Sequence, residues 1–326
     1  MNKWFKNIGP GVLVAAAFIG PGTVTLCTIA GVQFGYALLW AMTLSIVATV
    51  VLQEMAARVG IITKKGLAAV IKRQLKNPII KGMAITLILG AIVVGNAAYE
   101  AGNISGAVLG MGALFGEESA HLYPLLIGVI AFILLFIGNY KLLERSLVFL
   151  VILMSISFVL TAFITKPAIG SILKGAFVPS FPQDSLLTII GLIGTTVVPY
   201  NLFLHASLVK EKWRKKKHLK HARKDTLISI ILGGIVSMAI IVTATGITGD
   251  TISSGADLAK GLEPLYGRFA RYFMGIGLFA AGITSAITAP LAAAYVAKSC
   301  FGWKATMKDF RFRVVWFIIL GLGVLF

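Results

Sequence analysis

The sequence predicts an all-α polytopic membrane protein, with residues 1–326 forming a single transmembrane domain of about nine spans. Two observations carry this prediction. Of the 326 residues, 58% are hydrophobic and 13% are charged, and the mean hydropathy is +0.91. The hydrophobic residues also form continuous runs that are long enough to cross roughly 30 Å of hydrocarbon. A transmembrane β-barrel would instead show alternating segments of about 10 residues, so the runs exclude that class.

The apolar runs follow one another at short intervals along the whole chain. The ninth run begins near Val314 and reaches Phe326, which is shorter than the roughly 20 residues that a spanning helix needs. We therefore expect this run to be cut off inside a helix and the intact protein to carry at least one further segment. The first eight spans are predicted at 10–32, 36–60, 83–114, 122–140, 145–165, 185–209, 226–248 and 268–297.

The positions of lysine and arginine predict the orientation, because short cytoplasmic loops retain these residues. With the N-terminus inside, the inner segments hold 25 of the 30 lysine and arginine residues, and the densest run covers 210–224. This distribution accounts for the net charge of +18, so we expect contact with anionic lipid at the cytoplasmic face and no nucleic-acid partner. The expected location is the plasma membrane, with several spans and a cytoplasmic N-terminus.

Two predicted spans carry a proline at their middle. These are the first span, at residues 20–22 around Pro21, and the sixth, at residues 198–200 around Pro199. In hydrocarbon every backbone N–H and C=O needs a partner, so an interrupted helix survives only where it is buried in protein or lines a cavity. Interruptions at matching places in two halves of a chain point to a substrate site near the midplane of a secondary transporter.

Two ionisable residues lie deep within the predicted spans. Glu100 is at the middle of the third span, where an ionisable group is a functional-site hypothesis by default. The alternative is a neutral carboxyl group that hydrogen-bonds to Asn96 or Asn103. His205 follows Val198 on nearly the same face of the sixth helix, and it is either a proton relay or a satisfied structural group.

Other polar and small residues predict packing rather than chemistry. Glu54 is one helical turn from Arg58, a spacing that predicts a structural ion pair near the inner face. Gly102, Gly106 and Gly110 follow each other at four-residue spacing, which gives the third helix a face where another backbone can approach closely.

Two stretches resemble the Nramp divalent-metal transporters. Residues 9–40, GPGVLVAAAFIGPGTVTLCTIAGVQFGYALLW, are similar to that family's first helix, whose hallmark is Asp-Pro-Gly-Asn. Residues 186–209, LLTIIGLIGTTVVPYNLFLHASLV, are similar to its sixth helix, whose hallmark is Met-Pro-His. The resemblance implies the LeuT-like inverted repeat with broken helices 1 and 6, with a first repeat at about 9–165 and an incomplete second repeat at about 185–326.

The resemblance also assigns site residues, although the side chains differ. The family's metal-binding aspartate falls on Gly20, its asparagine on Thr23, its methionine on Val198 and its first histidine on Tyr200. The resemblance further implies a backbone carbonyl ligand from Thr195. These five residues are the predicted substrate-binding set.

The helix breaks are assigned to Pro21, Gly22 and Pro199. The resemblance places the family's proton route on Glu100 and His205. No particular metal is predicted for the site.

The predicted function is an Nramp-like secondary transporter that moves a divalent cation by alternating access, with proton coupling and altered selectivity. Hydroxyl and carbonyl ligands do not favour Mn²⁺ or Fe²⁺ over Mg²⁺ or Ca²⁺. Two alternatives stay open: transport of another solute, such as hydrated Mg²⁺ or a small organic molecule, and a non-transporting sensor on the same fold. We expect no enzyme activity and no cofactor, because no catalytic set or nucleotide-binding loop is present. We expect a monomer.

Overall fold

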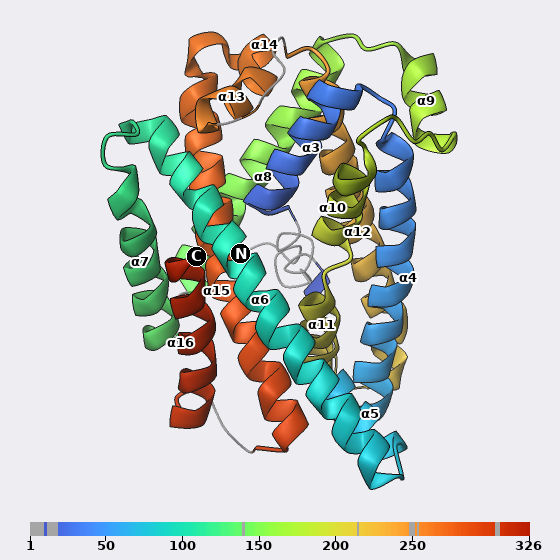
Figure 1. Ribbon diagram of the computed structural model, residues 1–326. Helices are drawn as coiled ribbons and strands as arrows, with labels where there is room; N and C mark the ends of the chain where they lie inside the picture. Colours follow the sequence, from blue (N-terminus) through green and yellow to red (C-terminus); the bar gives the residue numbers. More distant parts are fainter. Residues whose placement is uncertain are drawn as a thin grey trace.

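The computed structural model describes residues 10–11, 19–138, 141–213, 215–247, 252, 254–303 and 307–326. Between residues 141 and 150, the only side chains that it describes are those of Val148 and Phe149. No strand occurs in the described ranges, and long helices run between the two ends of one bundle (Figure 1). The all-α prediction is confirmed.

The long helices of the bundle are α3 (Pro21–Phe34), α4 (Leu39–Thr63), α6 (Pro78–Phe115), α7 (Tyr123–Ile137), α8 (Lys141–Ile164), α10 (Leu186–Thr196), α11 (Pro199–Lys212), α12 (Leu219–Ala244), α15 (Ala270–Phe301) and α16 (Phe310–Leu325). Four short helices connect them: α5 (Leu67–Gln74), α9 (Ile169–Phe177), α13 (Gly255–Ala259) and α14 (Glu263–Tyr266). In Figure 1, α5 lies at the lower end of the bundle, and α9, α13 and α14 lie at the upper end.

Six helical segments in the described part of the chain are long and apolar enough to cross a membrane: Leu39–Thr63, Pro78–Phe115, Ala120–Ile137, Leu186–Lys212, Lys216–Ala244 and Gly255–Phe301. The remaining predicted spans correspond to shorter helices. α3 covers the second part of the span predicted at 10–32, whose residues 12–18 lie outside the described residues. α8 contains the shorter apolar stretch Val151–Ile164, and α16 corresponds to the ninth run.

The centre of the bundle is the packing of α15 against α6. In the most apolar stretch of the segment Gly255–Phe301, which contains α15, 83% of the residues are buried. This is the highest share among the six apolar segments of the described chain, so α15 is the innermost of them. A side chain on Gly110 of α6 would meet the backbone of Gly275 and Phe279, and one on Gly282 would meet Ala107. Lipid provides little hydrophobic force between helices, so small residues at such contacts stabilise the bundle through close backbone packing.

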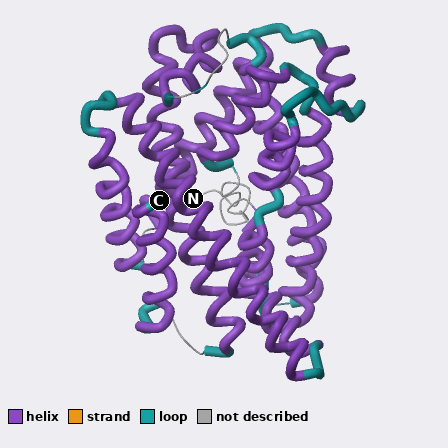
Figure 2. The backbone as a smooth tube through the Cα atoms, viewed as in Figure 1, coloured by secondary structure: helices purple, strands orange, loops and turns teal. Residues whose placement is uncertain are grey.

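Pro21 begins α3, and the sixth helix is broken at Pro199. Gly20 is the N-cap of α3, with φ −87° and ψ 175°, and Pro21 occupies the start of the helix, where its missing N–H costs nothing. α10 ends at Thr196 and α11 begins at Pro199, because proline cannot donate to the carbonyl four residues earlier. Figure 2 shows the α10–α11 connection as a short loop at mid-height in the bundle.

Glu54 holds α4 against α12. Its carboxylate pairs with Arg58 at 2.8 Å, which confirms the predicted ion pair, and with Arg223 of α12 at 2.5 Å. The second contact was not visible from the sequence, because it joins helices that are far apart in the chain.

Candidate functional site

Polar side chains of α4 hold both halves of the broken sixth helix. Ser45 hydrogen-bonds to Thr196 at the end of α10. Two turns further along α4, Gln53 Oε1 lies 2.9 Å from His205 Nδ1 on α11. The other ring nitrogen, His205 Nε2, lies 3.5 Å from Thr226 Oγ1 on α12. The single helix α4 therefore bonds to the sixth helix on both sides of its break.

Between these two contacts lie buried polar groups with no partner among the described residues. Thr49 is one turn before Gln53 on α4, and Asn201 is one turn before His205 on α11, so each lies between the two contacts along its own helix. Both side chains are at most 2% exposed, and Thr49 Oγ1 and both amide atoms of Asn201 lack a described partner. Buried polar groups of this kind mark places where an unseen water, ion or ligand belongs.

Tyr99 of α6 contacts both half-helices. Its hydroxyl donates to the Gly194 carbonyl of α10 at 2.9 Å. Its ring packs edge-on against Tyr200 of α11, with 5.7 Å between centroids and an interplanar angle of 77°. Tyr99 therefore links α6 to both sides of the break in the sixth helix.

The C-terminus of α10 supplies carbonyl oxygens at the break. No described residue donates a hydrogen bond to the carbonyls of Thr195 or Thr196, whereas the carbonyls of Leu192, Ile193 and Gly194 all accept bonds. The carbonyl end of a helix carries partial negative charge. This end of α10 therefore favours a cation.

The start of α3 lies in the buried interior. Gly20 and Thr23 are both buried, and the Gly20 carbonyl accepts from the backbone N–H groups of Thr23 and Val24 at 3.1 Å each. α3 also packs on α10, where Leu26 lies against Gly191. The start of α3 and the end of α10 are thus parts of one packed region.

Glu100 of α6 is fully buried where α6 packs against α16. Its Oε2 accepts from Asn103 Nδ2 at 3.2 Å, its Oε1 has no partner among the described residues, and Gly323 of α16 packs directly on the side chain. Asn96, the other candidate partner, instead donates to the Ala289 carbonyl of α15 at 2.8 Å.

The predicted substrate-binding residues come from two elements that pack on each other, the sixth helix and α3. Thr195, Val198 and Tyr200 lie around the break of the sixth helix, and Gly20 and Thr23 lie at the start of α3. The two residues of the predicted proton route have different partners: His205 bonds to Gln53, and Glu100 bonds to Asn103.

Sequence reasoning missed Tyr99 and the polar face of α4. The available signal for the latter was the four-residue spacing of Ser45, Thr49 and Gln53 in an otherwise apolar span, because residues at that spacing share one helix face.

The acidic and sulfur-bearing residues do not form a metal cage in the described ranges. No group of three or more His, Cys, Asp or Glu side chains is placed there to hold a metal ion. A cation at the helix breaks would therefore meet hydroxyl, amide and carbonyl oxygens.

The whole chain matches known proteins. The profile of the family described as Natural resistance-associated macrophage protein-like matches residues 11–326. The chain belongs to the Nramp family. Members of this family are membrane transporters, not enzymes, which confirms the expectation that this chain is not an enzyme.

Relatives of this Nramp chain are named as metal transporters. The divalent metal cation transporter MntH of Caldanaerobacter subterraneus subsp. tengcongensis is 28% identical. The alignment covers 99% of this chain and 79% of the relative. MntH of Mesorhizobium japonicum is 32% identical, covering 89% of this chain and 67% of the relative. The metal transporter nramp1 homolog of Dictyostelium discoideum is 31% identical, covering 90% of this chain and 58% of the relative.

Solved structures show the same fold. A manganese transporter of Eremococcus coleocola, solved as a point mutant, superposes with a TM-score of 0.78 over 98% of this Nramp chain and 70% of that chain, at 20% identity. The architecture therefore matches that of the Nramp transporters.

Proposed function

We propose that this Nramp chain is a secondary transporter that moves a divalent cation through the breaks in helices 1 and 6, with altered selectivity. One observation carries the proposal. The break in the sixth helix exposes the carbonyls of Thr195 and Thr196, which have no described donor, and the buried side-chain oxygens of Asn201 and of Thr49 on the neighbouring α4 also lack described partners. Relatives named as divalent metal cation transporters cover nearly the whole chain.

The altered selectivity follows from the ligand types. Gly20, Thr23 and Val198 replace the aspartate, asparagine and methionine of the family's hallmark motifs, so the site has lost a fixed negative charge and a soft sulfur atom. Hard oxygen ligands suit Mg²⁺, Ca²⁺ and Mn²⁺ and give little preference for softer ions. Without a carboxylate, the site has little to offset the free-energy cost of removing all water from a divalent ion.

The proposed mechanism is alternating access. Two groups of helices move against each other. The first is helices 1, 2, 6 and 7, which are α3, α4, α10 with α11, and α12. The second is helices 3, 4, 8 and 9, which are α6, α7, α15 and α16. The contacts from α4 to both halves of the sixth helix, and from Glu54 to Arg223 of α12, support the first group as one unit. In this proposal the inverted repeats are residues 9–165 and 185–326, the N-terminus is cytoplasmic, and the transporter is a monomer in the plasma membrane.

Proton coupling is the second part of the proposal. Glu100 and His205 are the two buried ionisable groups that the resemblance assigns to the proton route, and Glu100 Oε1 lacks a partner among the described residues. We assign the binding and release of the coupled proton to these two residues. Uptake that leaves the internal pH of liposomes unchanged, in wild type and in Glu100→Gln alike, would contradict the assignment.

The neutral character of the site favours one alternative solute class. Thr49, Asn201, Thr23 and Tyr200 present hydroxyl and amide groups in an otherwise apolar region, as pockets for small organic molecules often do. Retained hydration water around Mg²⁺ would meet the same groups. A sensor that does not transport would keep these residues and show no flux.

The deciding experiment measures uptake of Mn²⁺, Mg²⁺ and Ca²⁺ into liposomes that contain the purified protein, with isothermal titration of the same ions. Pro199→Ala should restore a continuous sixth helix and reduce uptake. Pro124→Ala is the matched control, because Pro124 lies in the first turn of α7, away from the breaks. Wild-type uptake in Pro199→Ala would refute the mechanism, and neither binding nor uptake of any of the ions would favour the organic solute or the sensor.

A further inference from the structure

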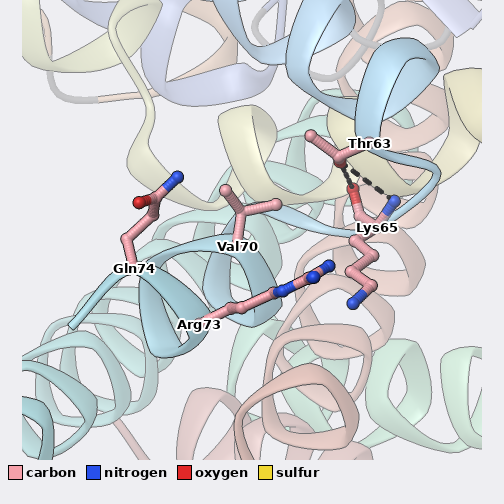
Figure 3. A pocket seen from close by; sticks show the side chains of 5 residues that line it. All are labelled: Thr63, Lys65, Val70, Arg73 and Gln74. Atoms are coloured by element: carbon pink, nitrogen blue, oxygen red, sulfur yellow. Dashed lines mark hydrogen bonds between the residues drawn. The ribbon is translucent and has the colours of Figure 1, made fainter. Parts of the chain in front are cut away.

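A cavity of about 290 Å³ lies at the lower end of the bundle, where α4 turns into α5. It is distant from the helix breaks, and the proposed transport cycle does not use it. Five residues line it: Thr63, Lys65, Val70, Arg73 and Gln74 (Figure 3).

Two positive charges meet in this cavity. Figure 3 shows the side chains of Lys65 and Arg73, from the α4–α5 turn and from α5, extending toward the same space. In the described part of the chain, the ion pairs join Glu54 to Arg58 and Arg223, and Asp257 to Lys260, so neither cavity cation has a carboxylate partner there. Two cations that face one cavity repel each other, and an anion between them removes that repulsion.

The backbone around the cavity is held firmly. Thr63 Oγ1 donates to the Val59 carbonyl at 2.7 Å and accepts from the Lys65 N–H at 3.2 Å, which fixes the turn. α5 is fastened to α15, because Ser299 Oγ accepts from the Ala69 N–H at 3.1 Å and Lys72 donates to the Cys300 carbonyl at 2.9 Å. The cavity is therefore part of the folded bundle.

An apolar stripe on α4 runs toward the end of the helix that lines the cavity. Val47, Val51, Met55 and Ile62 lie on one face of α4 and are between 45% and 56% exposed, as expected for side chains in contact with lipid tails. Lys65 follows Ile62 by three residues, just past the end of the helix. A molecule with its tail along the stripe would have its headgroup at Lys65 and Arg73.

We propose that this cavity binds the phosphate headgroup of an anionic phospholipid, with the acyl chains along the exposed face of α4. Arg73 offers a planar fork of donors to the phosphate oxygens, and Lys65 adds a point charge. Gln74 supplies a polar group for the remainder of the headgroup. The site is independent of which solute the transporter carries.

The test is native mass spectrometry of the purified protein, titrated with phosphatidylglycerol or with phosphatidylcholine of the same chains. The wild type should retain one tightly bound phosphatidylglycerol and no comparable phosphatidylcholine. Lys65→Gln with Arg73→Gln should weaken that adduct about thirtyfold, because each cation near an anionic headgroup contributes roughly a fivefold factor in affinity. The matched control, Lys216→Gln with Lys217→Gln, removes the same charge from exposed residues between α11 and α12 and should keep the adduct within about threefold.

Three results would overturn the proposal. Equal loss in both double variants would mean diffuse attraction to a basic surface. Equal retention of phosphatidylcholine would mean that the cavity does not recognise the net negative charge of the headgroup. Full displacement of the lipid by millimolar inorganic phosphate would mean that the cavity takes free phosphate. Melting temperatures of the lipid-free variants equal to that of the wild type will show that each variant is folded.

Discussion

The contact between Gly106 and Pro21 gives a sharp test of how the start of α3 is held. A methyl group on Gly106 of α6 would overlap the ring of Pro21, the first residue of α3. Gly102, one turn earlier on α6, has nothing within 4 Å of the corresponding position. Gly106→Ala and Gly102→Ala are therefore the same chemical change on the same helix, with and without a neighbour.

The expected magnitudes follow from packing and from helix propensity. Insertion of a methyl group into a close-packed contact costs about 1–3 kcal/mol. Replacing glycine by alanine within a helix contributes about 0.5–1 kcal/mol in the opposite direction. Gly106→Ala should thus destabilise the protein by up to about 2.5 kcal/mol, and Gly102→Ala should be neutral or stabilising by up to about 1 kcal/mol.

The assay can use the protein's own cysteines. Cys27 and Cys300 are both buried, so a thiol-reactive dye will report their exposure as the protein unfolds on heating in detergent. Gly106→Ala should melt below the wild type and Gly102→Ala at or above it. Uptake into liposomes should fall in Gly106→Ala, because the contact joins the two groups of helices that are proposed to move. Equal melting and uptake in the two variants would refute this account of the α3–α6 contact.

Three further changes test the site. Gly20→Asp places a carboxylate at an N-cap whose extended backbone suits aspartate, and it should raise Mn²⁺ affinity at least about tenfold in isothermal titration; unchanged heats would mean that the site has diverged by more than one charge. Tyr99→Phe removes the bond to Gly194 but keeps the ring, and it should cost about 1 kcal/mol in thermal unfolding; a wild-type melting curve would contradict the bridging role. Gln53→Leu leaves His205 Nδ1 without its partner and should cost about 1–3 kcal/mol, less when combined with His205→Leu; strict additivity would show that the two side chains are not coupled.

The architecture could be predicted because its determinants are local. Apolar length defines a spanning helix, and proline ends one, so the helix boundaries at Pro21 and Pro199 follow directly from the sequence. The predicted span at 226–248 begins later than α12, which starts at Leu219. Hydropathy marks only the part of a helix that lies in hydrocarbon, and the basic first turns of α12 can be helical outside it.

The site could be predicted only in part because its contacts depend on register between distant helices. The spacing of Gly102, Gly106 and Gly110 predicted close packing, and it holds for two of the three. Which helix meets each glycine is a matter of tertiary placement. In the same way, Tyr99 looked like one more aromatic residue in a span until the structure placed it against Gly194.

The neutral site and its support on α4 lead to one conclusion about selectivity. Ser45 and Gln53 already hold Thr196 and His205, so the polar side chains of α4 and α11 that stay without a described partner near the break are those of Thr49 and Asn201. Hydroxyl and amide groups bond well to water molecules in an ion's hydration shell, but they do not supply the charge that removal of those waters requires. Mg²⁺ gives up its water reluctantly. A site that leaves the hydration shell in place therefore avoids the largest dehydration cost when the ion is Mg²⁺. We therefore infer that uptake of Mg²⁺ will be comparable to that of Mn²⁺, and that Gly20→Asp will shift the ratio toward Mn²⁺.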